Sequence, residues 1–150
     1  MCIFQAAAIF GTGLVAGIFA MGTFAVHPAV FALDRAAHLS FRHQMNRRLA
    51  RFMPPIMLLT VAAFIADLML CPPSMARPLD LLATWFAVAT LVITILINGP
   101  LNRRFARWTP DALPQNWTRQ IRRWNFAHAF GTITSIAAFA FAILASDTGR

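Results

Sequence analysis

The chain has 150 residues, of which 59% are hydrophobic and only 12% are charged, and its mean hydropathy is +0.63. Soluble domains are about 45–50% apolar, so this composition excludes an ordinary soluble domain and predicts an integral membrane protein. The formal net charge of +8 comes from arginine, because the sequence contains no lysine. We expect no nucleic-acid partner, since a basic surface of that kind needs a soluble domain to carry it.

Four apolar segments predict four transmembrane helices. Each approaches the roughly 20 residues that cross about 30 Å of hydrocarbon. The first segment lacks the positively charged start of a signal peptide and is longer than the apolar part of one, so we expect a mature helix. The predicted fold class is all-α, a single integral membrane domain over residues 1–150 that forms a four-transmembrane-helix bundle. The helices are expected at residues 3–26, 53–71, 79–97 and 126–145.

The arginines predict how the bundle is oriented. Arginine-rich connections stay in the cytoplasm, and the connections after the first and third predicted helices hold most of the arginines, whereas the second connection and the tail hold only Arg77 and Arg150. We therefore expect a protein of the bacterial inner membrane, in contact with membrane lipid, with both termini outside the cytoplasm. The two basic connections contain Arg35, Arg42, Arg47, Arg48 and Arg51, and Arg103, Arg104, Arg107, Arg119, Arg122 and Arg123.

The first basic connection predicts a short interfacial helix between helices one and two. Apolar residues recur every three or four positions from Val30 to Leu49, which is typical of a helix that lies partly along the membrane surface. Pro54 would then open the second span. His38 and His43 belong to this stretch, and we expect them to be solvated.

Cys2 and Cys71 lie at the predicted outer ends of the first and second helices. Thiols on that side of a bacterial envelope can be oxidised, so a disulfide is one alternative. Pairing needs Cα atoms within roughly 7 Å, which no sequence pattern establishes here. Two cysteines of ordinary burial are therefore the expectation.

Gly13 and Gly17 form a small-xxx-small motif in the first predicted helix. Small residues let helix backbones approach closely within a membrane. We expect the motif to pack inside the protein's own bundle. The alternative is a homo-oligomer that forms through the same two glycines.

Polar residues from three predicted helices lie at one depth, near the inner face of the membrane. Unpaired polar groups in hydrocarbon cost roughly a few kcal/mol each, so several at one level indicate a shared site. The Gly99-Pro100 pair is expected to break the third helix there and to turn nearby amides into a common pocket. The residues concerned are Thr23, His27, Asn98, Asn102, Trp124, Asn125 and His128.

The two histidines of this set carry different expectations. His27 precedes Pro28, so it either caps the first span at the interface or takes part in the site. His128 lies inside an otherwise apolar helix, which favours a function.

Four stretches of the sequence resemble the anthrone oxygenase-like family, and the resemblance covers essentially the whole chain. They are HPAV after the first helix, RLARFMPPIML at the second, INGPLNRRFARW closing the third and WTRQIRRWNFAH leading into the fourth. The resemblance implies a four-helix membrane protein, and the fungal members with an assigned role oxidise anthrones to anthraquinones with dioxygen. It supports Asn98, Pro100, Asn102, Trp124 and His128, and also His27 and Pro28. Two positions depart from the family pattern, Val26 in place of an acid and Gly131 in place of an arginine.

The resemblance implies a cofactor-independent oxygenase acting on an apolar aromatic molecule from the bilayer. His128 or His27 suits the base, and Asn98 and Asn102 suit the donors that hold an oxyanion. We expect Thr23, Pro100, Trp124 and Asn125 to line the substrate site, with no metal and no cofactor. One alternative is a metal held by both histidines, which lack an acidic or cysteine partner at that depth. The other is a non-enzymatic scaffold or carrier for an apolar molecule.

Overall fold

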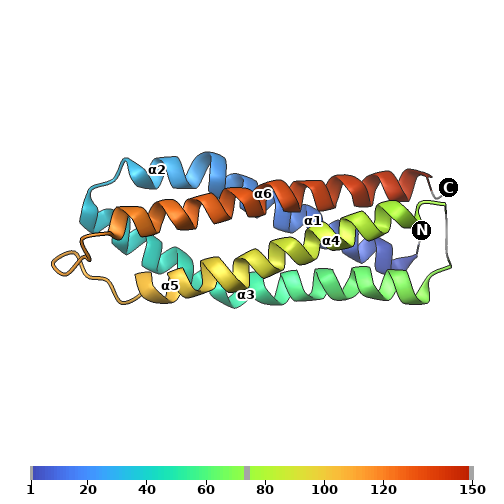
Figure 1. The fold of residues 1–150 in the computed structure, drawn as a ribbon, viewed down its shortest axis with the longest axis horizontal. Helices are drawn as coiled ribbons and strands as arrows, with labels where there is room; N and C mark the ends of the chain where they lie inside the picture. The colour runs from blue at the N-terminus through green and yellow to red at the C-terminus, as the bar shows by residue number, and fades with distance from the viewer. Residues whose placement is uncertain (1, 73–74, 149–150) are drawn as a thin grey trace.

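The computed structural model of the chain describes residues 2–72 and 75–148. The described residues form four long helical rods. The rods lie side by side, and the start of α1 and the end of α6 lie at the same end of the bundle (Figure 1). The predicted all-α fold is confirmed. Arg150, which contributed to the predicted orientation, lies outside the described residues.

The first and third rods are each assembled from three consecutive helical segments. The first consists of α1 (Ile3–Met21), η1 (Gly22–Val26) and α2 (His27–Phe31), and the third of α4 (Arg77–Ile93), η2 (Thr94–Asn98) and α5 (Gly99–Phe105). The second rod is α3 (Arg35–Leu70) and the fourth is α6 (Trp117–Thr148). All four are long and apolar enough to cross a membrane, which indicates an integral membrane protein.

The rods pack as a ring in which α1 and α4 each contact both α3 and α6. Alanines dominate the central contact between the rods, with Ala8, Ala83, Ala87, Ala138 and Ala142 around Phe64. Small residues let helices approach closely where lipid supplies no hydrophobic driving force. Large apolar side chains such as Phe10, Leu59 and Trp85 point outward instead, as lipid contact requires.

A π-helical turn lies directly ahead of a proline in both segmented rods. η1 precedes His27-Pro28, and η2 precedes Gly99-Pro100. Proline has no N–H, and its ring crowds the carbonyl four residues earlier. The wider turn absorbs that conflict, because the N–H groups of His27 and Gly99 donate to the carbonyls of Gly22 and Thr94, five residues back.

The third helix therefore does not break at Gly99-Pro100, and that prediction is wrong. The helix continues through η2 into α5 and ends at Phe105. His27 likewise does not cap the first span, since it lies within a rod that runs on to Phe31. Continuous helices satisfy their own backbone groups, which a membrane interior demands.

The predicted interfacial helix is also wrong as a separate element. α3 runs unbroken for 36 residues and contains Pro54 and Pro55. The first half of α3 packs against the rest of the bundle through Leu39, which lies in one buried cluster with Leu101 and Phe105. This half therefore continues the second rod and does not form an element of its own.

His38 is buried and His43 is half-buried, and both imidazoles bind backbone carbonyls, contrary to the prediction that they are solvated. His38 is 3% exposed, and its Nδ1 donates to the carbonyl oxygen of Val30 over 3.0 Å. His43 donates from Nε2 to the carbonyl oxygen of Phe105 over 2.7 Å. Both imidazoles thus attach α3 to the ends of neighbouring rods.

Cys2 and Cys71 form a disulfide, so the expectation of two cysteines of ordinary burial is wrong. Their Cα atoms lie 6.3 Å apart. The physical reason is topological: α1 begins where its antiparallel neighbour α3 ends, so the two residues face each other at the same level. We call this end of the bundle the disulfide end, and the opposite end, which holds α2 and α5, the arginine-rich end (Figure 1).

The two glycines of the small-xxx-small motif behave differently. A Cβ added to Gly13 would lie 2.9 Å from the Phe139 ring, so Gly13 packs inside the bundle against α6. A Cβ added to Gly17 would meet nothing within 4 Å. Internal packing therefore uses Gly13 alone, and a homo-oligomer through this face stays a prediction.

Replacing Cys71 by serine should lower the melting temperature of the purified protein. The disulfide joins two residues that are 69 positions apart in the sequence, and removing such a cross-link costs about 2–4 kcal/mol of stability. Differential scanning fluorimetry in detergent measures the change. The Cys2→Ser variant and the double variant should match Cys71→Ser, since each removes the same bond, and maleimide labelling of both thiols in unreduced native protein would contradict the assignment.

Candidate functional site

Two histidines and a tryptophan meet at the arginine-rich end. The imidazole of His27, from α2, lies edge-on to that of His128, from α6, with ring centroids 4.5 Å apart. Trp124 lies one helical turn before His128; its ring stacks on that imidazole at 4.9 Å and meets the His27 ring edge-on at 4.9 Å. The α1 residue Phe19 also lies parallel to the His128 ring, at 4.5 Å. The structure thus brings His27, Trp124 and His128 together as predicted.

Two glycines make this arrangement of rings sterically feasible. A Cβ on Gly22 would lie 2.6 Å from Nε2 of His128, and a Cβ on Gly131 would lie 2.6 Å from the Phe19 ring. Side chains at these positions would displace the rings. An arginine at position 131, which the resemblance implied, would therefore displace the Phe19 ring.

Arg42 is a candidate functional residue that the sequence reasoning missed. Its side chain is 2% exposed, and its guanidinium carbon lies 4.8 Å from the Trp124 ring centroid and 5.2 Å from that of Phe105. The signal was present as a spacing of four residues. His38, Arg42 and Asn46 fall on one face of α3, and each has a buried polar atom without a hydrogen-bond partner.

Buried polar atoms without partners concentrate at the arginine-rich end. Buried polar groups in folded proteins are nearly always hydrogen-bonded, and leaving one unpaired costs about 1–3 kcal/mol. Their concentration marks this end of the bundle as the candidate site. At this end they are His38 Nε2, Arg42 Nε and Nη1, Asn46 Nδ2, Asn98 Oδ1, Asn102 Oδ1, Gln120 Oε1, Trp124 Nε1, Asn125 Oδ1 and His128 Nε2.

The other predicted site residues lie on the elements around these rings. Asn98 is buried at the end of η2, which packs against α6, and Asn102 follows one turn later on α5. Pro100 follows the π-helical turn and fixes the path of α5. Thr23 pairs with Thr132, with the two hydroxyl oxygens 2.7 Å apart. Asn125 is half-buried on α6, next to Trp124.

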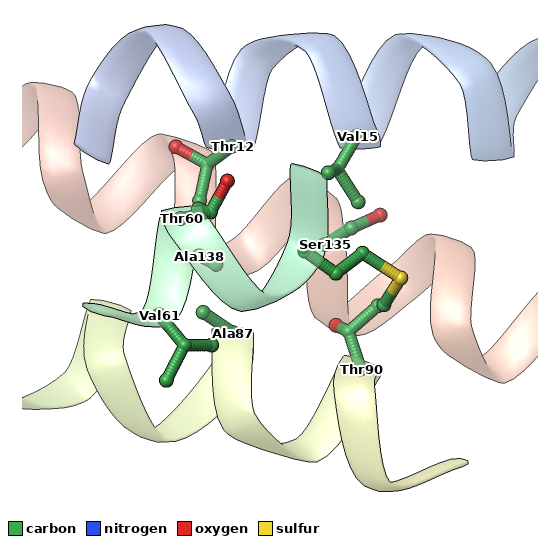
Figure 2. A pocket seen from close by; sticks show the side chains of 9 residues that line it. Thr12, Val15, Thr60, Val61, Ala87, Thr90, Ser135 and Ala138 are labelled. Carbon is green, nitrogen blue, oxygen red and sulfur yellow. The ribbon is translucent and has the colours of Figure 1, made fainter. Parts of the chain in front are cut away.

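A separate cavity lies in the middle of the bundle, between α1, α3, α4 and α6 (Figure 2). Its volume is about 10 Å³, which is room for about one water molecule. The hydroxyls of Thr12, Thr60 and Thr90 line it, and each donates to a carbonyl of its own helix. This cavity is too small for an organic ligand, and its polar groups are already satisfied.

The donor set at the arginine-rich end suits a metal poorly. Two imidazoles lie together there, but the nearby Arg42 is a cation, which disfavours a second cation. Among the described residues, one group of three metal-ligand types lies close together, namely Cys2, Asp67 and Cys71. Its two sulfurs are bonded to each other, so they are not thiolate ligands.

The fold and site define a class: an integral membrane protein of four helices with a buried histidine, arginine and tryptophan site at one end. A sequence model of the anthrone oxygenase family matches residues 41–141. The chain therefore belongs to the anthrone oxygenase family. The matched stretch contains Arg42, Asn98, Trp124 and His128, whereas His27 precedes it. Comparisons with curated proteins and with solved structures found no match.

Replacing Gly22 by alanine should destabilise the protein. The added Cβ would lie 2.6 Å from Nε2 of His128, and overpacking of this kind costs about 1–3 kcal/mol. Thermal unfolding in detergent measures the loss.

Gly17→Ala is the matched control. It lies in the same rod and its Cβ would meet nothing within 4 Å, so its melting temperature should equal or exceed that of the parent protein. Equal stability of the Gly22 and Gly17 variants would refute the placement of the His128 ring.

Proposed function

We propose that this protein oxidises a flat, apolar aromatic compound of the anthrone type with dioxygen. The observation that carries the proposal is the pair of imidazoles, His27 and His128, packed against one indole beside a buried guanidinium. Family membership supports the reaction class. The alternative is a carrier or scaffold that binds such a molecule without changing it.

The reaction needs a base more than it needs a metal. An anthrone methylene is acidic because its anion is aromatic. That anion gives one electron to dioxygen, and the two radicals combine into a new C–O bond. Protonation gives a hydroperoxide, and loss of the remaining C–H proton with cleavage of the O–O bond gives a carbonyl group and water. One dioxygen is consumed, one oxygen atom enters the product and the other leaves as water.

His27 is the better placed of the two imidazoles to take the first proton. Its side chain is 7% exposed, and neither of its ring nitrogens is among the fully buried atoms without a partner. The side chain of His128 is half-buried as a whole, but its Nε2 is fully buried against Gly22. We assign the proton transfer to His27 and assign His128 the role of holding that imidazole in place.

The remaining assignments follow from side-chain chemistry. The flat indole of Trp124 suits stacking on a planar substrate. The amide groups of Asn98 and Asn102 suit hydrogen bonding to substrate oxygens. Thr23, Pro100 and Asn125 stay predicted members of the substrate site, and the substrate would reach it from the membrane lipid.

We further propose that the arginine-rich end faces the cytoplasm of a bacterial-type inner membrane and that both termini lie outside. Arginine-rich connections are retained on the cytoplasmic side. The disulfide at the opposite end supports the same orientation, because disulfides persist in an oxidising compartment. Arginines that are exposed at this end include Arg47, Arg48, Arg103, Arg104, Arg122 and Arg123.

Replacing His27 by glutamine should lower anthrone-dependent oxygen uptake by at least roughly 100-fold, because general-base catalysis contributes about that much or more. His128→Ala should lose uptake to a similar extent, since the His27 ring then loses its neighbour. An oxygen electrode with membranes that contain each variant, supplied with a simple anthrone, measures the rates against empty membranes.

His43→Gln is the control. The His43 imidazole lies on another face of α3 and donates to the carbonyl of Phe105, and glutamine retains a donor. Its rate should stay near that of the parent protein. Oxygen uptake by the parent protein no faster than the spontaneous rate would reject the oxygenase assignment. Anthrone binding without oxygen uptake would support the alternative, a carrier or scaffold.

A C-terminal fusion to alkaline phosphatase should be active, and a C-terminal fusion to green fluorescent protein should be dark when exported through the Sec pathway. Both results follow if the C-terminus lies outside, where phosphatase disulfides form. Phosphatase activity and fluorescence in whole cells measure the two outcomes. A fluorescent, phosphatase-negative pair would reverse the proposed orientation.

A further inference from the structure

Arg42 is a buried cation without a carboxylate partner among the described residues. The sequence contains no glutamate, so its side-chain carboxylates are those of five aspartates. Asp34 caps the start of α3 through the N–H groups of Ala36 and Ala37. The remaining aspartates, Asp67, Asp80, Asp111 and Asp147, lie near the disulfide end or in exposed positions.

Packing alone gives no reason for an arginine at this position. Burying a charge is strongly unfavourable unless hydrogen bonds and an opposite charge compensate it. The faces of Trp124 and Phe105 supply part of that compensation through cation–π contact. These aromatic faces do not pair the N–H groups at the edge of the guanidinium, since Nε and Nη1 are buried without a hydrogen-bond partner.

We propose that Arg42 binds the ionised oxygen of an aromatic ligand, a phenolate or the enolate of an aryl ketone. A guanidinium presents its N–H groups in a planar fork, which suits an oxyanion. Trp124 and Phe105, which contact Arg42, belong to an apolar cluster that also contains Leu39, Leu101 and Ile121, and such surroundings favour a flat hydrocarbon ring over a small hydrated anion. This inference rests on the proposed function and names the chemical class of its substrate.

Trp124 connects this role with the proposed proton transfer. The His27 ring and the Arg42 guanidinium both lie against its indole. When the C–H bond of the methylene breaks, the proton moves to an imidazole nitrogen of His27 and the electron pair delocalises onto the ketone oxygen. Arg42 then donates to that oxygen and stabilises the negative charge where it develops. The substrate must therefore carry an oxygen conjugated with its reacting carbon.

The test uses 1,8-dihydroxyanthraquinone, which already carries the product carbonyl groups and cannot repeat the oxidation. Its visible absorption changes when a phenol ionises. Bound to the purified protein, it should ionise with a pKa about one to three units below that of the same dye in empty detergent micelles, because a cation favours the anionic form. Absorption spectra recorded across a pH titration measure the shift.

Arg42→Gln should abolish the shift, and Arg42→Lys should retain part of it, because lysine keeps the charge and loses the planar fork. Arg47→Gln is the matched control, since Arg47 lies on the same helix and is exposed, and its titration should match the parent protein. Gel filtration checks that each variant remains folded. If Arg42→Gln fails to fold, the comparison of the parent with Arg42→Lys decides.

An equal shift in the parent and in Arg42→Gln would overturn the inference, and so would a parent protein that does not bind the dye or binds it without a shift. The result also separates this inference from the oxygenase proposal. If the pKa shift of the dye depends on Arg42 but the protein takes up no oxygen with anthrone, the anion-binding site is supported and the oxygenase proposal is rejected.

Discussion

A helix that crosses a membrane has no water to satisfy an open backbone group, so its hydrogen bonds must close within the protein. Pro28 and Pro100 conflict with that constraint, and both rods resolve the conflict with a π-helical turn that ends two residues before the proline. The extra residue in such a turn rotates everything that follows by about 100°. His27, which directly follows the first turn, and Asn98, which ends the second, are both buried. The candidate site therefore depends on how these rods accommodate proline.

Several energetically unfavourable features lie near those two turns. Arg42 is buried without a counter-ion, polar side-chain atoms lack partners, and His128 lies so close to Gly22 that a Cβ there would collide with it. Where a protein departs from the rules of packing and hydrogen bonding, the departure is expected at a functional site, and other parts of the structure compensate for it. Here the compensation is the tight alanine packing at the middle of the bundle and the disulfide at its far end.

The sequence predicts the four membrane helices, because long apolar runs carry a strong signal, and it predicts that His27, Trp124 and His128 meet. It could not predict that the helix continues through Gly99-Pro100, since the π-helical turn that makes this feasible has no motif of its own. Arg42 was assigned to a basic surface because its burial depends on contacts with Trp124 and Phe105, which are distant in sequence. The disulfide stayed an alternative for the same reason, since only helix pairing brings the two cysteines together.

The central claim is that the buried histidine and arginine residues generate an aromatic anion before oxygen reacts. Mixing the purified protein with an anthrone under nitrogen, and recording the absorption spectrum in a stopped-flow instrument, tests this claim most directly. We predict that the band of the anthrone anion appears without oxygen, at a pH where free anthrone stays neutral, and decays when oxygen is admitted. A spectrum that remains that of neutral anthrone until oxygen is admitted, followed by turnover, would contradict the account.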